Sequence, residues 1–544
     1  MADRHLKQYS YSTVLRTIAF AVLVVIPIQR LHPVAVPPRL IQSHPMLKTR
    51  TASHTLSQQL CQRFAERIRD RLLLPGARLP SVRLCAAQQG VSVSTVVAAY
   101  DQLQALGWVE ARRNRGFYVR ENVREVLFSA SNRPPDQQKS ARAAIKSIAN
   151  FHPSEAAFEG QGNHTAAAAM PADGIALIRG MFRQAGHLPQ PGMGTFPPDW
   201  LANTFMPAAV RKALAGGASQ TAALEYGDPM GDMGLRRALS HKLAGLQIEV
   251  APSEIMTTLG ATHALDIASR TLLRPGDCVM VEEPGWAVEF ARLQALGMRL
   301  LPVPRRAEGP DLEVMAQYCE RHQPALFICV SVLHNPTGGS LRPDNAYRLL
   351  QLAQQHHFTI VEDDTYSHLA PDQATRLCAL DGLQRTIYVS GFAKILAPGW
   401  RVGFMAAAPE LMGRLLDRKL LSTLTTPALF EQAMAFCLAQ GQLRRHAERI
   451  RARLEQARLR STRLALAHGC TFAAEPAGLF GWIDTGVDSD ALAQQLLDQG
   501  YLSAPGSLFH AVRAPSSLMR INFATTQDAA FWQTLARLRA VQKG

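Results

Sequence analysis

Five groups of residues between positions 260 and 401 have side chains or backbone suited to chemistry, and each follows an apolar, β-rich run. The runs that we predict to be strands are Ile255–Leu259, Cys278–Val281, Leu326–Val332, Phe358–Val361 and Thr386–Val389. The groups that follow them are Gly260-Ala261-Thr262, Glu282 to Trp286, His334 to Gly339, Glu362 to Tyr366, and Ser390 to Lys394. Helical stretches separate the runs, which predicts an α/β fold with a mostly parallel sheet. Because ligands of open α/β sheets bind at the carboxyl ends of strands, we expect these groups to form one site.

The chemistry of the five groups fits pyridoxal 5'-phosphate. Backbone N–H groups of Gly260, Ala261 and Thr262 at a helix start would hold the phosphate dianion. Arg401, seven residues after Lys394, would be the cation beside it. The Lys394 amine would form a Schiff base with the cofactor aldehyde and later move the proton at the α-carbon of a substrate.

The remaining polar groups would hold the pyridine ring. Trp286 would stack on the ring, Asn335 and Tyr366 would hydrogen-bond its phenolic oxygen, and Asp363 would keep its nitrogen protonated. Each feature alone also fits a common structural role, such as a turn, a core tryptophan or a surface lysine. Their order and spacing carry the prediction.

These residues resemble the fold-type I aminotransferases, from about Gly192 to the C-terminus. The matching motifs are His334-Asn335-Pro336-Thr337-Gly338, Asp363-x-x-Tyr366, Lys394 with Arg401, and Arg520 in Leu-Met-Arg-Ile-Asn-Phe. The resemblance implies that Arg520 binds a substrate α-carboxylate. It also implies a homodimer, in which Tyr226 reaches the phosphate of the partner subunit's cofactor. The family usually has Ser or Thr three residues before the lysine as a phosphate ligand, whereas this chain has Gly391, with Ser390 beside it.

Positive charge is concentrated near the N-terminus. Residues 46–128 contain 13 basic and 6 acidic residues, a net charge of +7. The pattern predicts helices at Leu56–Leu73, after Pro80-Ser81, and at Ser92–Leu106 with Ser92 as N-cap. Strands at Trp108–Ala111 and Phe117–Arg120 would enclose an arginine-rich turn. Three helices and a basic hairpin indicate a winged helix-turn-helix.

The first turn of the third helix is small and polar, as suits entry into the DNA major groove, and the basic hairpin suits phosphate or minor-groove contact. The alternative is a protein-interaction domain with a solvated basic face. The segment from Leu74 to Leu103 resembles the GntR family of bacterial transcription regulators, although Val93 stands where that family often has Arg. The candidate DNA-binding residues are Arg83, Ser92, Ser94, Thr95, Arg112, Arg113 and Arg115.

Composition limits the remaining possibilities. The chain has 544 residues, a net charge of +15, 47% apolar residues and 19% charged residues, which excludes a wholly disordered, collagen-like or multi-span membrane protein. Eight cysteines occur singly with no CxxC pair, as expected for reduced core residues of a cytosolic protein. His356-His357 has no companion at metal-ligand spacing, so we expect no metal site.

We expect four segments. Residues 1–45 would lie outside the fold, with Met46 as the working start. The alternative of a secretory signal peptide is disfavoured, because Gln29 and Arg30 follow the 11-residue apolar run Ile18–Ile28 where a cleavage site would need small residues. Residues 46–125 would form the DNA-binding domain and 126–190 a linker, in which short helices could form at Ala141–Ile148 and Ala176–Phe182. Residues 191–544 would form the cofactor domain.

A GntR-like winged helix joined to an aminotransferase-like domain resembles the MocR subgroup of transcription regulators. That resemblance implies a dimeric, cytoplasmic regulator that binds operator DNA as a duplex and responds to pyridoxal phosphate or to an amino acid or amine. The alternative is a working class I/II aminotransferase with an accessory DNA-binding domain, because the residues for transamination are present.

Overall fold

The computed structural model describes residues 55–69, 73, 75–112, 116–120, 190–215 and 225–543. The predicted N-terminal extension, positions 126–189 of the predicted linker with its two short helices, and the wing residues Arg113 and Arg115 lie outside the described residues.

The N-terminal module has three helices and a hairpin, as the sequence predicts. Its elements are α1 (Leu56–Arg69), α2 (Val82–Gln89), α3 (Val93–Ala105), β1 (Val109–Arg112) and β2 (Gly116–Val119). Ser92 is the N-cap of α3, because its hydroxyl accepts a hydrogen bond from the backbone N–H of Thr95 at 3.1 Å. Phe64, Tyr100 and Trp108 are buried in the module's own core, so this small unit has a hydrophobic centre separate from the large domain.

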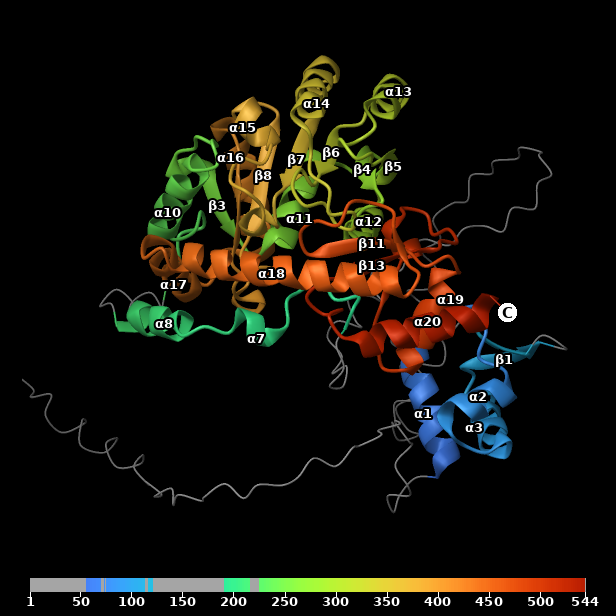
Figure 1. Ribbon diagram of the computed structural model, residues 1–544. Helices are drawn as coiled ribbons and strands as arrows, with labels where there is room; N and C mark the ends of the chain where they lie inside the picture. The colour runs from blue at the N-terminus through green and yellow to red at the C-terminus, as the bar shows by residue number, and fades with distance from the viewer. Residues whose placement is uncertain are drawn as a thin grey trace, which may run out of the picture.

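The large domain is built on a seven-stranded sheet with the spatial order β3-β9-β8-β7-β6-β4-β5. The strands are β3 (Ile255–Thr258), β4 (Cys278–Glu283), β5 (Arg299–Pro304), β6 (Leu326–Cys329), β7 (Thr359–Asp363), β8 (Thr386–Gly391) and β9 (Gly403–Ala406). Figure 1 shows this sheet with helices packed around it. The five predicted strands are present, whereas β5 and β9 were not anticipated.

Both faces of the sheet are covered by helices, which explains why its strands are continuous apolar runs. Val279 and Val281 of β4 pack on one face, and Met280 packs on the other, following the two-residue period of a strand. The first face is covered by α11 (Ala261–Leu272), α12 (Ala287–Ala295) and α16 (Pro409–Thr423). The second is covered by α13 (Leu312–His322), α14 (Pro343–His356) and α15 (Leu377–Asp381).

One strand of the sheet runs backwards. β9 pairs antiparallel with both β3 and β8, whereas β4, β5, β6, β7 and β8 pair in parallel. Consequently β3 and β8 point the same way, and the carboxyl ends of β3, β4, β6, β7 and β8 share one edge. Since β9 starts where the others end, the residues just before it, including Arg401, also lie at this edge.

A second, antiparallel sheet lies beside the first, in the order β10-β11-β13-β12. Its strands are β10 (Thr471–Phe472), β11 (Phe480–Asp484), β12 (Ala504–Pro505) and β13 (Leu518–Asn522), and its helices are α19 (Ser489–Asp498) and α20 (Ala529–Lys543). The long helix α18 (Gln442–Ala467) runs from α17 (Ala428–Ala439) to this unit (Figure 1). The other helices and 3₁₀ turns are α7 (Pro198–Leu201), α8 (Phe205–Ala215), α10 (Met233–Ala244), η2 (Pro252–Glu254), η3 (Ser367–Leu369), η4 (Pro398–Trp400) and η5 (Gly506–Phe509).

The N-terminal module contacts the second sheet's unit through α1. The guanidinium of Arg67 is ion-paired with the carboxylate of Asp498 at the end of α19, and both side chains are buried. Figure 1 shows the module beside α19 and α20. A charged pair withdrawn from water holds its partners in a defined geometry, because either charge alone would be costly to bury.

All eight cysteines lie within the described residues, and each is buried and unpaired, as predicted for core residues. No helix in the described part of the chain is long and apolar enough to span a bilayer.

Candidate functional site

A cavity of about 1390 Å³ opens at the carboxyl edge of the parallel strands. It collects residues from all five predicted groups and from the second sheet. Those that the sequence predicts and that line it are Ala261, Thr262, Trp286, Asn335, Asp363, Tyr366, Lys394, Arg401 and Arg520. The sequence-predicted groups therefore meet in one place.

The side chain of Lys394 lines this cavity. It donates a hydrogen bond to the backbone carbonyl of Gly194 at 2.9 Å. The pKa of Lys394 is lowered to about 8, mainly by withdrawal from water and also by the positive charges of Arg520 and Arg401, whereas Asp363 opposes this change. A substantial fraction of the amine is therefore neutral near pH 8, and only a neutral amine can attack an aldehyde.

The start of α11 forms a backbone cradle beside Arg401. Gly260 precedes the helix with φ of +81°, and no side chain caps the helix start. The guanidinium of Arg401 donates to the carbonyl of Leu259 at 2.7 Å. A Cβ on Gly260 would lie 2.8 Å from that guanidinium, and a Cβ on Gly403 would lie 2.5 Å from the Gly260 Cα. Glycine at both positions keeps the cradle open and the cation close, which is the arrangement that a phosphate group needs.

The carboxylate of Asp363 ends β7 and faces the cavity. One of its oxygens accepts hydrogen bonds from the backbone N–H of Thr365 at 3.0 Å and from the Thr365 hydroxyl at 2.5 Å. Withdrawal from water raises the pKa of Asp363 to about 6, against the lowering effect of these hydrogen bonds. A cationic partner in the cavity would restore full ionisation, which suits a protonated ring nitrogen. The neighbouring Asp364 turns to the other side of the strand and pairs with Arg376 at 2.6 Å.

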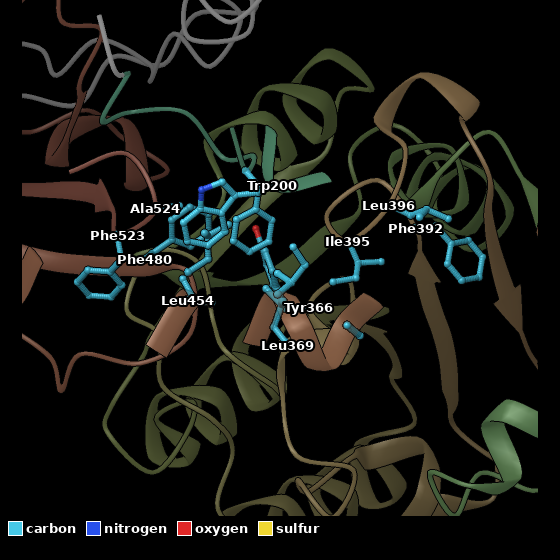
Figure 2. Packing of buried hydrophobic residues seen from close by; sticks show 14 of the residues in the cluster. Trp200, Tyr366, Leu369, Phe392, Ile395, Leu396, Leu454, Phe480, Phe523 and Ala524 are labelled. Carbon is cyan, nitrogen blue, oxygen red and sulfur yellow. The ribbon is translucent and has the colours of Figure 1, made fainter. Parts of the chain in front are cut away.

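Aromatic side chains form the walls. Trp286 is the half-buried N-cap residue of α12. Tyr366 is buried with its ring edge-on to Phe480 at 5.7 Å, and both belong to the hydrophobic cluster around the second sheet. Figure 2 shows Trp200, Tyr366 and Phe480 gathered on one side of that cluster, with Phe392 and Leu396 on the other. Rigid packing of Tyr366 fixes where its hydroxyl can donate.

Arg520 on β13 is buried at 3% exposure and has neutral partners. Its guanidinium donates to the side-chain oxygen of Asn335 at 2.8 Å and to the carbonyl of Gly192 at 2.5 Å. Its Nε has no hydrogen-bond partner among the described residues. Burial lowers the pKa of Arg520 to about 10. A buried cation with an unused donor is a receptor for an anion, and a carboxylate fits a guanidinium with two hydrogen bonds.

Three predicted cofactor residues, Gly260, Ser390 and Tyr226, are not among those lining the cavity, although Gly260 forms the backbone cradle described above. The hydroxyl of Ser390 donates to the carbonyl of Asp364 at 2.9 Å, away from the cradle. The adjacent Gly391 is the residue that faces the cradle, since a Cβ there would lie 3.5 Å from the backbone nitrogen of Ala261. Tyr226 is 81% exposed and does not line this cavity.

The sequence reasoning missed the segment from Gln190 to Phe196, which we call the strap. Its carbonyls at Gly192 and Gly194 accept from Arg520 and Lys394, and the Asn522 side chain donates to its carbonyls at Met193 and Thr195. A Cβ on Gly192 would lie 2.5 Å from the Ser503 backbone, so glycine is needed for this approach. The paired glycines of Pro-Gly-Met-Gly were the available signal.

In the N-terminal module, the predicted DNA-binding residues Arg83, Ser92 and Ser94 are exposed, and Thr95 is half-buried. The Ser92 hydroxyl is within hydrogen-bond distance of the hydroxyls of Ser94 and Thr95 at 2.8 Å. Arg112 pairs with Glu110 and lies over the ring of Tyr118. Across the described ranges no group of His, Cys, Asp or Glu side chains could hold a metal ion.

Comparison with known families assigns both parts of the chain. The profile of bacterial regulatory proteins of the gntR family matches residues 56–119, and the profile of aminotransferase class I and II matches residues 195–538. The chain is 30% identical over 377 residues to the 2-aminoadipate transaminase of Thermus thermophilus, covering 67% of this chain and 91% of that enzyme. It is also 30% identical over 407 residues to the probable rhizopine catabolism regulatory protein MocR of Rhizobium meliloti, covering 74% of this chain and 75% of that regulator.

A similar fold is seen in the solved structure of LysN, an alpha-aminoadipate aminotransferase from Thermus thermophilus. The TM-score is 0.62 at 24% identity, over 68% of this chain and 95% of LysN. The large domain is thus a fold-type I aminotransferase domain, and the chain belongs to the class I and II aminotransferase family. With its N-terminal GntR domain, the chain is a member of the MocR-type regulators. The predicted fold class and the predicted family are confirmed.

The lowered pKa of Lys394 predicts how cofactor incorporation depends on pH. Pyridoxal phosphate added to cofactor-free protein should produce a visible Schiff-base absorbance at a rate that rises as the pH approaches 8 and is nearly constant above it. With an ordinary lysine, whose pKa is 10.5, the rate of Schiff-base formation would continue to rise well above pH 8. Lys394→Ala should give no band at any pH.

A matched control is Lys242, whose pKa is also lowered to about 8 by burial. It is not among the residues lining the cavity. Lys242→Ala should leave both the band and its pH profile unchanged. A band that survives in Lys394→Ala would exclude the lysine from this role.

The orientation of Gly391 toward the cradle predicts that a hydroxyl can be added there. In Gly391→Ser the new side chain would lie beside the Ala261 N–H, where a phosphate would bind. One further hydrogen bond to a charged group contributes about 1.5 kcal/mol, so pyridoxal phosphate should bind about tenfold more tightly, as measured by equilibrium dialysis. Gly391→Ala supplies the control, because it fills the same space without a hydroxyl. Equal affinity of the two variants would show that position 391 does not face the phosphate.

Proposed function

We propose that the protein is a pyridoxal-phosphate-dependent transcription regulator that acts as a homodimer on duplex DNA. Its large domain binds the cofactor through Lys394 and senses the cofactor itself or an amino compound that reacts with it. Its GntR domain implies DNA binding. The observation that carries the proposal is that Lys394 and Arg520 share one cavity with a strap that leads back toward the DNA-binding module.

The residues present fit the cofactor on their own chemistry. The open cradle at Gly260 beside Arg401 suits a phosphate, and the carboxylate of Asp363, with its pKa raised by burial, calls for a cationic partner. When bound, pyridoxal phosphate supplies an electron sink for chemistry at the α-carbon of an amine. Lys394 would hold it covalently and move the α-proton, while Tyr366 and the free amide N–H₂ of Asn335 would orient the ring.

The strap provides one route from ligand to DNA-binding module. Gly194 and Gly192 accept hydrogen bonds from Lys394 and Arg520, the same two groups that a cofactor and a carboxylate would engage. A ligand that occupies these donors must release the strap or compete with it. The strap adjoins in sequence the segment that joins the large domain to the N-terminal module, and we propose that displacement of the strap changes the constraint at this end of that segment.

The docking contact of Arg67 provides a second route. Arg520 lies on β13, β13 pairs with β12, and α19 packs beside β12 and carries Asp498 at its end. Movement of β13 on ligand binding would therefore reach the ion pair that holds the module. Regulation requires that the ligand bind with different affinity to the protein with the Arg67–Asp498 pair formed and to the protein with that pair broken. The contacts between β13, β12 and α19 make such a difference possible.

The second candidate function is aminotransferase catalysis. It is favoured because the residues assigned to transamination, Lys394, Asp363, Tyr366 and Arg520, all line the cavity. It is also favoured by the 30% identity with an enzyme named 2-aminoadipate transaminase. The two candidates differ in what the N-terminal module does. A regulator needs sequence-selective DNA binding, whereas a transaminase needs turnover.

DNA selection and turnover measured on one preparation test the proposal. The full-length protein should enrich particular sequences from a random duplex pool while transaminating amino acids barely above background. Replacing Arg112, Arg113 and Arg115 by Ala should weaken DNA binding and lower its salt dependence, by about one unit of slope for each arginine that binds a phosphate in the wild type. The visible spectrum should not change.

The control removes three positive charges elsewhere, at the exposed α18 residues Arg444, Arg445 and Arg460. That variant should bind DNA as the wild type does. Fast turnover together with DNA binding that is indifferent to sequence would overturn the regulator in favour of the enzyme.

The buried ion pair predicts that Asp498→Asn uncouples cofactor from DNA. In the wild type, DNA affinity should differ by about fivefold or more between the cofactor-free and the loaded protein. In Asp498→Asn this difference should fall to less than half, because Arg67 loses the charge that holds α1 to α19. Asp344→Asn, an exposed carboxylate on α14, is the matched control. An undiminished difference in Asp498→Asn would exclude this route.

A further inference from the structure

We infer that the ligand of the large domain is an α-amino acid with a long, uncharged apolar or aromatic side chain. This inference rests on the proposed function, since it places the amino group beside a cofactor held by Lys394. It concerns the part of the cavity that neither the cofactor groups nor the carboxylate receptor occupy. Three observations support it, namely the charges that line the cavity, an apolar wall and the available space.

The carboxylate end of such a ligand has a receptor. Arg520 is buried against the rings of Phe480 and Phe509, with its guanidinium carbon 4.4 and 5.1 Å from their centroids. Its hydrogen bonds in the structure go to a carbonyl and an amide, and its Nε has none among the described residues. A buried guanidinium with an unused donor and no charged partner suits a carboxylate, which can accept two hydrogen bonds from it.

Every charged side chain that lines the cavity has a partner either in the cofactor or in the ligand's carboxylate. Of the described residues that line it, four are charged, namely Asp363, Lys394, Arg401 and Arg520. Asp363, Lys394 and Arg401 face the cofactor groups, and Arg520 faces the carboxylate. A second carboxylate or an ammonium group on the ligand's side chain would therefore leave water without meeting an opposite charge, which is unfavourable.

One wall of the cavity is apolar. It is formed by side chains of the strap, α7 and α8, together with residues around η4. Those that define it are Phe196, Leu201, Met206, Val210, Leu396 and Trp400. Phe196 stacks on Trp200 at 5.3 Å, so the wall is anchored to the cluster drawn in Figure 2.

The space available fits a large ligand side chain. The cavity of about 1390 Å³ must hold the cofactor as well as the ligand, and it is larger than the usual small-molecule site of about 300 to 1,000 Å³. An apolar surface of this kind gains free energy by contact with an apolar side chain, in proportion to the area removed from water. Charge, wall and size agree on the same class of ligand.

The test is a titration of the cofactor-loaded, full-length protein with L-leucine, L-methionine, L-phenylalanine, L-glutamate and L-lysine. The readouts are the change in the visible spectrum and the shift in melting temperature. We expect the three apolar amino acids to bind at least tenfold more tightly than glutamate and lysine. Glutamate or lysine binding as tightly as leucine would overturn the inference while leaving the cofactor proposal intact. A protein with no visible band after loading would instead refute the cofactor proposal and this inference with it.

A variant tests the wall itself. Met206→Arg places a cation in the apolar wall and should lower the ratio of the glutamate to the leucine dissociation constant by at least tenfold. Leu214→Arg, on the same helix but 56% exposed and outside the cavity, should leave the ratio unchanged. If Met206→Arg instead alters the oligomeric state in size-exclusion chromatography and not the ratio, the wall is an interface between copies of the chain, and the inference is wrong. The wild-type titration decides the question even if the variant does not fold.

Discussion

The cavity of the large domain holds an excess of positive charge that the protein itself does not neutralise. Lys394, Arg401 and Arg520 lie around one carboxylate, that of Asp363, among the described lining residues. Arg520 is buried and Lys394 is partly withdrawn from water, and burial lowers the pKa of both. Withdrawal of these charges from water is unfavourable, and anionic groups supplied from outside would offset that cost. A phosphate at Arg401 and a carboxylate at Arg520 would supply them.

The positions of these charges follow from strand direction. Because β3, β4, β6, β7 and β8 end at one edge, the groups after each strand are brought together although they are widely separated in sequence. The reversed strand β9 is what adds Arg401, since its first residues lie where its neighbours end. Close contact of Gly403 with Gly260 is needed for β9 to fit against the cradle. The reversed strand β9 and the phosphate cradle therefore depend on the same close backbone contact between Gly403 and Gly260.

Much of this could be predicted from sequence, for reasons that also explain what could not. Apolar runs followed by Gly, Asn, Asp and Lys mark strand ends, so the five groups and the parallel sheet were predictable. β9 was missed because Gly403–Ala406 is short and follows a motif already assigned to the site. Ser390 was predicted as a cofactor residue, but it occupies the strand position that points toward Asp364, and one residue along a strand reverses the face. The strap was missed because its contacts use backbone carbonyls, which leave little trace in sequence.

The strap also shows how binding and signalling can depend on the same atoms. Its two carbonyls hold the two cations that a ligand would take, and Asn522 holds the strap in place from β13, the strand that carries Arg520. Anion binding at Arg520 therefore affects the strap both directly and through its neighbour on β13. The strap follows in sequence the segment that leads from the DNA-binding module, and Arg67 holds that module to the unit of the large domain that contains β13. Under the proposed function, both connections of the module would therefore depend on β13. A ligand that moved this one strand would then change how the module is held, without any contact between ligand and DNA.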